Sequence, residues 1–374
     1  MKREIKKLQP GDFVLTILTF LLVIFGVIMV FSSSYYSSIN ETGSPYAYLK
    51  RDVVWAVLGF GLMVFTAIFD YRHYKKIALP LLILSAILLA LLFTPLGQQR
   101  NAATRWLGVG GFTIMPGEIA KIAIILFVAR YLSDKPDRIR SFKRGIFPLF
   151  VIMAVFAAMI LLQPNLSTAI TVCAIIILMM FVAGMHWGWF AGLFGTGVAG
   201  VAGLLMADPG GYWTQRFTSF LNPFADPLGT GYQVCQSLLA LGSGGLFGVG
   251  LGKSIEKNLY LPEPQNDFIL AIIGEELGFV GIIILLIVYI ALIWRGIHIA
   301  VNAPDQFGML LAAGITIMVA IQVILNIAVV TSSMPPTGIT LPFISYGGNA
   351  LMLFMGSMGI LLNISRHSGT VKQE

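Results

Sequence analysis

Long apolar runs are the feature that most constrains how this chain can fold. They are roughly 18 to 25 residues long, and a helix needs about 20 apolar residues to cross the hydrocarbon of a bilayer. Uninterrupted runs argue against the alternating strands of a membrane barrel, which leaves helices that satisfy their own backbone. Only 11% of the residues are charged and 57% are hydrophobic, whereas a soluble domain carries about 25% charged residues. The sequence therefore predicts an all-α polytopic membrane protein.

About ten transmembrane helices are expected within a single integral membrane domain, residues 1–374. The first run follows a basic N-terminus and has no small-residue cleavage site, so it is predicted to be a retained span and not a signal peptide. The expected spans are residues 13–33, 53–69, 77–95, 114–132, 146–163, 165–184, 188–207, 268–294, 307–331 and 346–364.

The positive charges predict how these spans are oriented. Lys and Arg accumulate in cytoplasmic loops, and an inside N-terminus puts sixteen of the 24 on the inner side and seven on the outer side. We therefore expect a multi-pass protein of the cytoplasmic membrane with both termini in the cytoplasm. The net charge of +7 follows from this topology, and no basic patch interleaved with aromatic residues indicates nucleic-acid binding.

One large outer loop, about residues 208–267, stands out from the short connections. Loops longer than about 15 residues are usually functional or disordered. Aromatic residues within this loop argue against disorder, among them those at positions 213, 217, 220, 224, 232 and 260. We expect it to carry short amphipathic helices that lie at the membrane interface.

Four carboxylates lie close together in LPEPQNDFILAIIGEELG, residues 261–278. Glu263 and Asp267 precede the eighth apolar run, whereas Glu275 and Glu276 fall about two turns inside it. Intramembrane acids are costly, so the deeper pair is expected to find polar partners inside the bundle. An Asp directly before an apolar helix is a favoured N-cap. A carboxylate near the bilayer surface can also have its pKa raised by desolvation and act as a general base.

The surroundings of Asp267 in the sequence favour the second role. Glu263, Arg216, Lys253 and Lys257 share its outer loop. Basic side chains of this kind could hold a diphosphate leaving group, because departure of that group needs charge neutralisation.

Two further segments carry polar residues towards the outer side. Glu118 and Lys121 lie three residues apart in the fourth span, which places them on one helix face. They form either a buried ion pair that fixes helix packing or one wall of a hydrated cavity. Before them, Arg105 offers a fork suited to phosphate oxygens, and Trp106 offers an indole suited to the headgroup zone. A final hairpin that contains Ser345 either lines the same cavity or is a plain turn.

Taken together, these segments resemble the SEDS family (shape, elongation, division and sporulation), whose members polymerise lipid II into peptidoglycan. The resemblance covers nearly the whole chain, and the LPEP form of one segment is closer to the FtsW and SpoVE branch than to RodA. The segments that carry it are RWLGVGGFTIMPGEIAKIA from residue 105, QPNLSTA from 163, FLNPFADPLGTGYQVCQSLLALGSGGLFGVGLGKS from 220, LPEPQNDFILAIIGEELGFVG from 261 and PPTGITLPFISYGG from 335.

The resemblance implies roles for individual residues. The essential outer-loop aspartate of the family falls on Asp267, its fourth-span acid and base fall on Glu118 and Lys121, and its Arg-Trp pair falls on Arg105 and Trp106.

Two positions depart from the family pattern. Asn165 stands where the family usually has Asp, and Asn349 stands where it usually has Ser. If the missing acid normally balances the lysine of the fourth span, Lys121 must rely more on Glu118. The second exchange is a milder one between polar residues.

The activity that the resemblance implies is a lipid II glycosyltransferase reaction, for cell division or sporulation, at the outer face of a bacterial cytoplasmic membrane. Asp267 would be the general base, and Arg216, Lys253 and Lys257 would screen the departing undecaprenyl diphosphate. A divalent cation, Mg²⁺ or Mn²⁺, is an optional addition to that screening. No other cofactor is expected, and the two cysteines at positions 173 and 235 have no metal-ligand spacing.

Two other function classes remain open at the level of sequence. A flippase or transporter for lipid II would also use the intramembrane Glu118 and Lys121, and a structural hub would only recruit partners. The chain shows no Ser-x-x-Lys acyl-enzyme site in a soluble domain. The family resemblance therefore implies a transpeptidase partner, a class B penicillin-binding protein, besides other divisome or elongasome membrane proteins.

Overall fold

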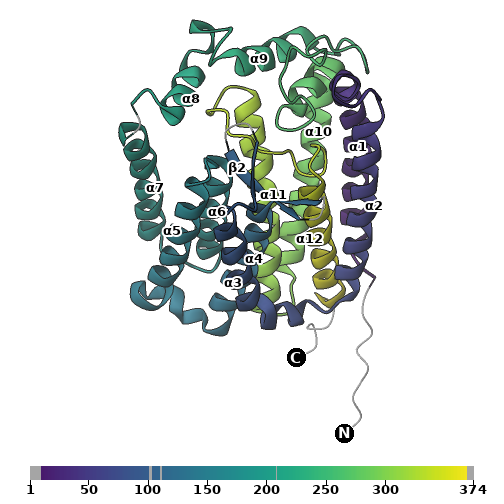
Figure 1. Ribbon diagram of the computed structural model, residues 1–374. Coiled ribbons are helices and arrows are strands. Elements are labelled where there is room, and N and C mark those ends of the chain that lie inside the picture. The colour runs from purple at the N-terminus through teal and green to yellow at the C-terminus, as the bar shows by residue number, and fades with distance from the viewer. Residues whose placement is uncertain (1–9, 101–102, 110–111, 208, 369–374) are drawn as a thin grey trace.

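The computed structural model is a bundle of long helices with one small β-sheet (Figure 1). It describes residues 10–100, 103–109, 112–207 and 209–368. The helices are α1 (Phe13–Thr42), α2 (Ala47–Ile68), α3 (Tyr74–Leu91), α4 (Pro116–Asp134), α5 (Phe147–Leu161), α6 (Leu166–Val182), α7 (Trp187–Ala207), α8 (Tyr212–Leu221), α9 (Tyr232–Gly244), α10 (Ile269–Val301), α11 (Gln306–Val330) and α12 (Gly348–His367). Short 3-10 helices cover Tyr71–His73, Pro136–Arg140 and Pro223–Ala225, and a π-helical turn covers Phe142–Ile146.

The prediction of an all-α polytopic membrane protein is confirmed. Within the described residues, eight helices are long and apolar enough to cross a membrane. The predicted fourth and sixth spans also form helices. One of them, α4, carries four charged residues, and the other, α6, has only 17 residues. A count of ten spans therefore stays a prediction. Several helices outrun their apolar cores, since α1 continues through a Ser- and Tyr-rich segment to Thr42.

A three-stranded antiparallel sheet between α3 and α4 was not predicted. Its strands are β1 (Gly97–Arg100), β2 (Ala103–Val109) and β3 (Phe112–Ile114), in the order β1-β2-β3. The register pairs Leu107 of β2 with Gly97 on one side and with Ile114 on the other. Strands this short show too few alternations for the pattern to be recognised in the sequence.

The start of α1 and the end of α12 meet at one end of the bundle. The backbone N–H of Asp12 donates to Ser365 Oγ at 3.1 Å, and the Asp12 carboxylate forms an ion pair with Arg295 in the second half of α10. The helices α8 and α9 lie at the opposite end (Figure 1). We call the end of the bundle at Asp12 and Ser365 the terminal end, and the end at α8 and α9 the loop end. Helices α8 and α9 belong to the predicted large loop, so this loop lies at the end of the bundle opposite Asp12 and Ser365.

Helices α2 and α12 run parallel and in close contact. A Cβ built on Gly348 would lie 2.2 Å from the Trp55 indole nitrogen, and one on Gly359 would lie 2.1 Å from Thr66 Oγ1. Glycines thus let the two backbones approach along their whole length, as small residues do between membrane helices. The start of α12, and the hairpin before it, is held against α2.

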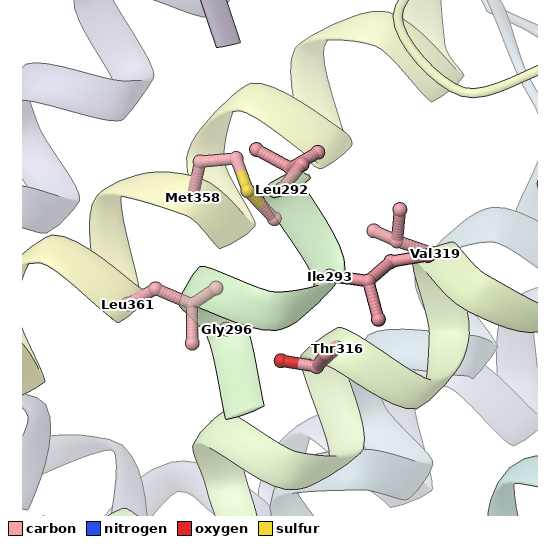
Figure 2. A pocket seen from close by; sticks show the side chains of 7 residues that line it. All are labelled: Leu292, Ile293, Gly296, Thr316, Val319, Met358 and Leu361. Atoms are coloured by element: carbon pink, nitrogen blue, oxygen red, sulfur yellow. The ribbon is translucent and has the colours of Figure 1, made fainter. Parts of the chain in front are cut away.

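The lower halves of α10, α11 and α12 pack with few gaps. Figure 2 shows a small apolar gap where Gly296 of α10 faces Thr316 of α11, closed by side chains of α12. Its volume is about 10 Å³, and a cavity needs about 10 to 15 Å³ to hold one water molecule. This region is therefore packing and not a ligand site.

Helix α10 is broken at Gly278, and the loop after α9 fills the break. Gly278 has φ 68° and ψ −170°. The backbone N–H groups of Val249 and Gly250 donate to the carbonyls of Glu275 and Glu276 at 2.9 and 3.0 Å. Beyond the break, the N–H groups of residues 279 and 280 donate to the carbonyls of residues 245 and 246. Four backbone bonds thus join the large loop to the membrane helix.

Candidate active site at the loop end

Asp267 lies in the last turn of the loop before α10. That helix begins at Ile269, and Phe268 occupies its N-cap position without a capping side-chain bond. The N-cap interpretation of Asp267 was therefore wrong, because the cap position is occupied by the next residue, Phe268. Within the described residues, no hydrogen bond or ion pair is recorded for the Asp267 carboxylate, which is partly buried.

The final hairpin covers the Asp267 carboxylate. A Cβ built on Gly338 would lie 3.1 Å from Asp267 Oδ2 and 3.2 Å from Arg105 Nη1. The carboxylate and the guanidinium therefore both border the hairpin at this glycine, which has φ +68°. Gly338 leaves room here that no other residue would leave.

Two arginines are aimed at this place by backbone contacts. Side chains alternate along a strand, so Arg105 in β2 projects to the same side as Leu107, which is buried. Arg105 Nη2 donates to the carbonyl of Pro164, and Arg216 Nη1, from α8, donates to the carbonyl of Pro336 in the hairpin. Residues from the sheet and from α8 thus converge on the hairpin and on Asp267.

The electrostatic environment raises the pKa of Asp267 to about 6. Desolvation is the largest cause, and the negative charge of Glu263 adds to it, while Arg105 and Arg216 act in the opposite direction. Glu263 itself is exposed and accepts a hydrogen bond from Asn266 Nδ2 at 2.6 Å. With its pKa raised to this level, the Asp267 carboxyl is mostly ionised at neutral pH yet basic enough to take a proton.

Glu118 and Lys121 form a buried ion pair near the same end of the bundle. Lys121 Nζ lies 2.7 Å from Glu118 Oε1 and Oε2, and both side chains are less than a tenth exposed. Glu118 is in the first turn of α4, where the helix dipole favours an acid. The neighbouring Gly117 packs against Thr168 at the start of α6. The start of α4, which carries the pair, therefore packs against the start of α6.

The two positions that depart from the family pattern keep structural contacts. Asn165 caps α6, since its Oδ1 accepts from the backbone N–H of Thr168 and from Ser167 Oγ. The single hydroxyl hydrogen of Ser167 is shared with the carbonyl of Thr337, which lies closer, at 2.6 Å, and this contact ties α6 to the hairpin. Asn349 Nδ2 donates to the carbonyl of Thr113 in β3. Asn165 therefore caps a helix that is tied to the hairpin, and Asn349 ties the start of α12 to β3.

Two of the basic residues expected near the diphosphate have other surroundings. Lys257 is 3% exposed, and its Nζ lies 2.7 Å from Glu276 Oε1 and 3.2 Å from Ser32 Oγ. Lys257 is thus part of a buried ion pair, and its contact with a diphosphate stays a prediction. Lys253 is exposed on the loop. Glu275 accepts from Ser254 Oγ and from the backbone of residue 255, so both deep acids have the polar partners that were predicted.

Ser345 and Trp106 border the site less directly. Ser345 is buried and its Oγ accepts from the backbone N–H of Leu341, so it closes the turn of the hairpin. Trp106 pairs with Gln98 across β1 and β2. On the Trp106 side of the strand, Thr104 lines a cavity of about 340 Å³ between α3, the sheet and the α5–α6 turn. It has the size of a small-ligand pocket and adjoins the site without any charged residue in its lining.

Asn326 is a site residue that the sequence reading missed. It lies in α11, is 0% exposed, and bonds to the backbone carbonyl of Asp267. A polar side chain within an apolar span is itself a functional signal, so its position inside the run 307–331 could have revealed it.

The donor set at the site suits an anion. Among the described residues, no three His, Cys, Asp or Glu side chains lie close enough together to hold a metal ion. Asp267 instead shares its surroundings with two arginines, whose guanidinium groups match phosphate oxygens.

The same chain-wide pattern is found in known proteins. A family model described as "Cell cycle protein", which covers FtsW, RodA and SpoVE, matches residues 13–370. The chain belongs to this family. It is 45% identical over 364 residues to the stage V sporulation protein E of Bacillus subtilis, covering 97% of this chain and 99% of the relative. It is 38% identical to the probable peptidoglycan glycosyltransferase FtsW of Geobacter sp., covering 96% and 98%.

Solved structures of this family share the fold. A chain of a peptidoglycan synthase complex, in which polymerization and crosslinking are coordinated, aligns with a TM-score of 0.80 and 26% identity over 96% of this chain and 99% of that chain. The rod shape determining protein RodA of Thermus thermophilus aligns with a TM-score of 0.70 and 27% identity, covering 95% and 97%. The likeness to the FtsW and SpoVE branch and the membrane bundle expected from the sequence are thus both confirmed.

Proposed function

We propose that this protein is a peptidoglycan glycosyltransferase that polymerises lipid II, with Asp267 as its general base. Family membership and the relatives named as glycosyltransferases support the reaction class. The single observation that supports Asp267 as the base is the environment of its carboxylate. It is partly desolvated, its pKa is about 6, and it faces two arginines at the hairpin.

In this reaction the Asp267 carboxylate accepts the proton of the acceptor sugar hydroxyl. The hydroxyl oxygen forms a bond to the anomeric carbon of the donor as the bond from that carbon to the diphosphate oxygen breaks. The electron pair leaves with the undecaprenyl diphosphate. Arg105 and Arg216 neutralise the charge that develops there, because fixed cations at a developing anion stabilise the transition state. Lys253 is exposed on the same loop and contributes to this field.

The supporting residues have separate tasks. Glu263 adjusts the basicity of Asp267, and the pair Glu118 and Lys121 fixes α4 beneath the site. Trp106 and Ser345 hold the sheet and the hairpin that form its walls.

The loop end faces the outside of the cytoplasmic membrane of a bacterium, and both termini are cytoplasmic. The excess of Lys and Arg at the terminal end supports this orientation. A class B penicillin-binding protein is the partner, alongside other membrane proteins of the division or elongation machinery. The similar chain in a complex that coordinates polymerization and crosslinking supports such a partner.

Reconstitution with purified protein and lipid II in detergent tests this proposal. A polymerase makes long glycans without any membrane gradient, whereas a flippase makes none. Glycan synthesis should be detectable without a partner protein, and its rate should rise when the transpeptidase is added. Asp267→Asn should fold and yield almost no polymer. Glycan chains of near-normal yield from that variant would show that Asp267 is not the base.

A further inference from the structure

Asn326 joins the two walls of the candidate site through one amide group. Its Nδ2 donates to the backbone carbonyl of Asp267 at 2.8 Å and to the backbone carbonyl of Ile339 at 2.7 Å. The side chain is 0% exposed. The side chain is thus shielded from bulk water, and the position of both bonds depends on the geometry of α11.

The chemistry of the two partners requires an amide donor at this place. Carbonyl oxygens only accept hydrogen bonds, and the NH₂ group of Asn can donate twice. A carboxylate would place an acceptor against two acceptors, and an aliphatic side chain would leave both carbonyls buried without partners, at a cost in free energy. The Oδ1 atom of Asn326 has no hydrogen-bond partner among the described residues. The amide thus contacts its surroundings through Nδ2.

The two carbonyls belong to the groups that define the site. Asp267 carries the proposed base. Ile339 follows Gly338, where an added Cβ would lie 3.1 Å from the Asp267 carboxylate and 3.2 Å from the Arg105 guanidinium. One NH₂ group therefore sets the spacing between the base and the hairpin that covers it.

We propose that Asn326 is a positioning residue for Asp267, which it holds beneath the hairpin at the distance that keeps the carboxylate desolvated. This inference rests on the proposed function, in which Asp267 is the base. The charged groups that act on Asp267 are Arg105 from β2, Arg216 from α8 and Glu263 from its own loop. Asn326 carries no charge, so its replacement acts on Asp267 only through position and hydration.

Loss of the amide has a specific kinetic signature. Both carbonyls would need water, and water that enters beside Asp267 stabilises the ionised carboxylate. The pKa of Asp267 then falls towards its ordinary value, and the acid limb of the rate profile moves to lower pH. A base displaced by about 1 Å can lower the rate about 100-fold. The turnover number should fall more than the Michaelis constant rises.

Asn363 provides a matched control. It is 2% exposed in α12, its Oδ1 accepts from the backbone N–H of Tyr71 at 2.9 Å, and its Nδ2 donates to the carbonyl of Ala67 at 2.9 Å. It therefore makes two buried bonds to backbone groups, as Asn326 does, but at the terminal end of the bundle.

The experiment compares Asn326→Ala, Asn326→Ser and Asn363→Ala as full-length purified proteins. Initial rates of glycan synthesis from lipid II are measured across pH, and thermal unfolding gives the folded fraction. We expect Asn326→Ala to lose about 10- to 100-fold in turnover with its acid limb shifted below pH 6. Asn326→Ser, whose hydroxyl can donate one bond, should fall between it and the unchanged protein. Asn363→Ala should lose stability with an unchanged profile.

An unshifted acid limb in both Asn326 variants, or an equal shift in Asn363→Ala, would overturn the positioning role. If Asn326→Ala does not fold, the Ser variant decides by the same criteria. Asp267→Asn separates the two proposals. Full activity in that variant would remove the base assignment, whereas an inactive Asp267→Asn beside an unshifted Asn326 series would remove only the role of Asn326.

Discussion

Asp267 and the pair Glu275 and Glu276 lie within ten residues of one another and have opposite surroundings. The two glutamates are buried and bonded, to Ser254, to the backbone of residue 255, to Lys257 and to Ser32. Asp267 has charged groups around it, but no hydrogen bond to its carboxylate is recorded among the described residues. Acids whose lone pairs are already engaged hold structure together. An acid kept desolvated without such partners is available to accept a proton.

The largest expected difference between these acids is in catalysis. General base catalysis typically contributes about 100- to 10,000-fold, so Asp267→Asn should lose polymerisation by a factor in that range. Glu275→Gln keeps the shape of the side chain, so its activity per folded molecule should stay within a few-fold of the unchanged protein. Glycan synthesis normalised to folded protein measures both. A comparable catalytic loss in Glu275→Gln would erase the distinction.

A second difference is expected in stability. Lys257→Met removes one partner of the buried pair and leaves the Glu276 charge without compensation, which typically costs about 3 to 5 kcal/mol. Thermal unfolding in detergent should show this loss. The double variant Lys257→Met/Glu276→Gln should recover much of it, because no buried charge remains. A single variant as stable as the unchanged protein would mean that the pair adds nothing to the fold.

A third prediction concerns the backbone at the break in α10, which lies close to the two buried glutamates. Gly278→Ala would put a side chain in a conformation open almost only to glycine, which costs about 1 to 3 kcal/mol. Its Cβ would also meet the backbone nitrogen of Gly248 at 2.3 Å. We expect the melting temperature to fall. Gly61→Ala in α2, where a Cβ meets nothing within 4 Å, is the control that should leave it nearly unchanged.

The smallest effect is the pH dependence that follows from the pKa of Asp267, about 6. A base must be ionised, and the ionised fraction of a group with this pKa falls about fivefold from pH 6 to pH 5, so the rate should fall by about the same factor. The stability effect has the opposite sign. The folded pKa lies above the ordinary 3.8, so ionisation disfavours the folded state, and this penalty grows from about pH 4 to pH 6 and is complete above it. Asp267→Asn should therefore be at least as stable at pH 7 as the unchanged protein, with no advantage below pH 4.

Local pattern accounts for what the sequence could predict. The apolar runs predicted the long helices, because length and hydropathy are properties of a single segment. The contact between Glu118 and Lys121 followed from a spacing of three residues on one helix. The position of Asp267 near a loop boundary was also correct, although its expected capping role was not.

The remaining features depend on contacts between distant segments. Ser32, Lys257 and Glu276 come from α1, the large loop and α10, and no local pattern links them. The site likewise needs the hairpin around Gly338, which reaches Asp267 across about 70 positions of the chain. Arg105 is aimed by a strand that is too short to be recognised from alternation.

The interrupted α10 also bears on how the protein is inserted into its membrane. The carbonyls of Glu275 and Glu276 and the N–H groups of Phe279 and Val280 find their partners only in residues 245–250. Lipid offers no hydrogen bonds to such groups. The helix therefore cannot reach its final state in the bilayer before the glycine-rich segment ahead of it has folded back. We therefore expect translocation of the loop and integration of α10 to be coupled during biogenesis.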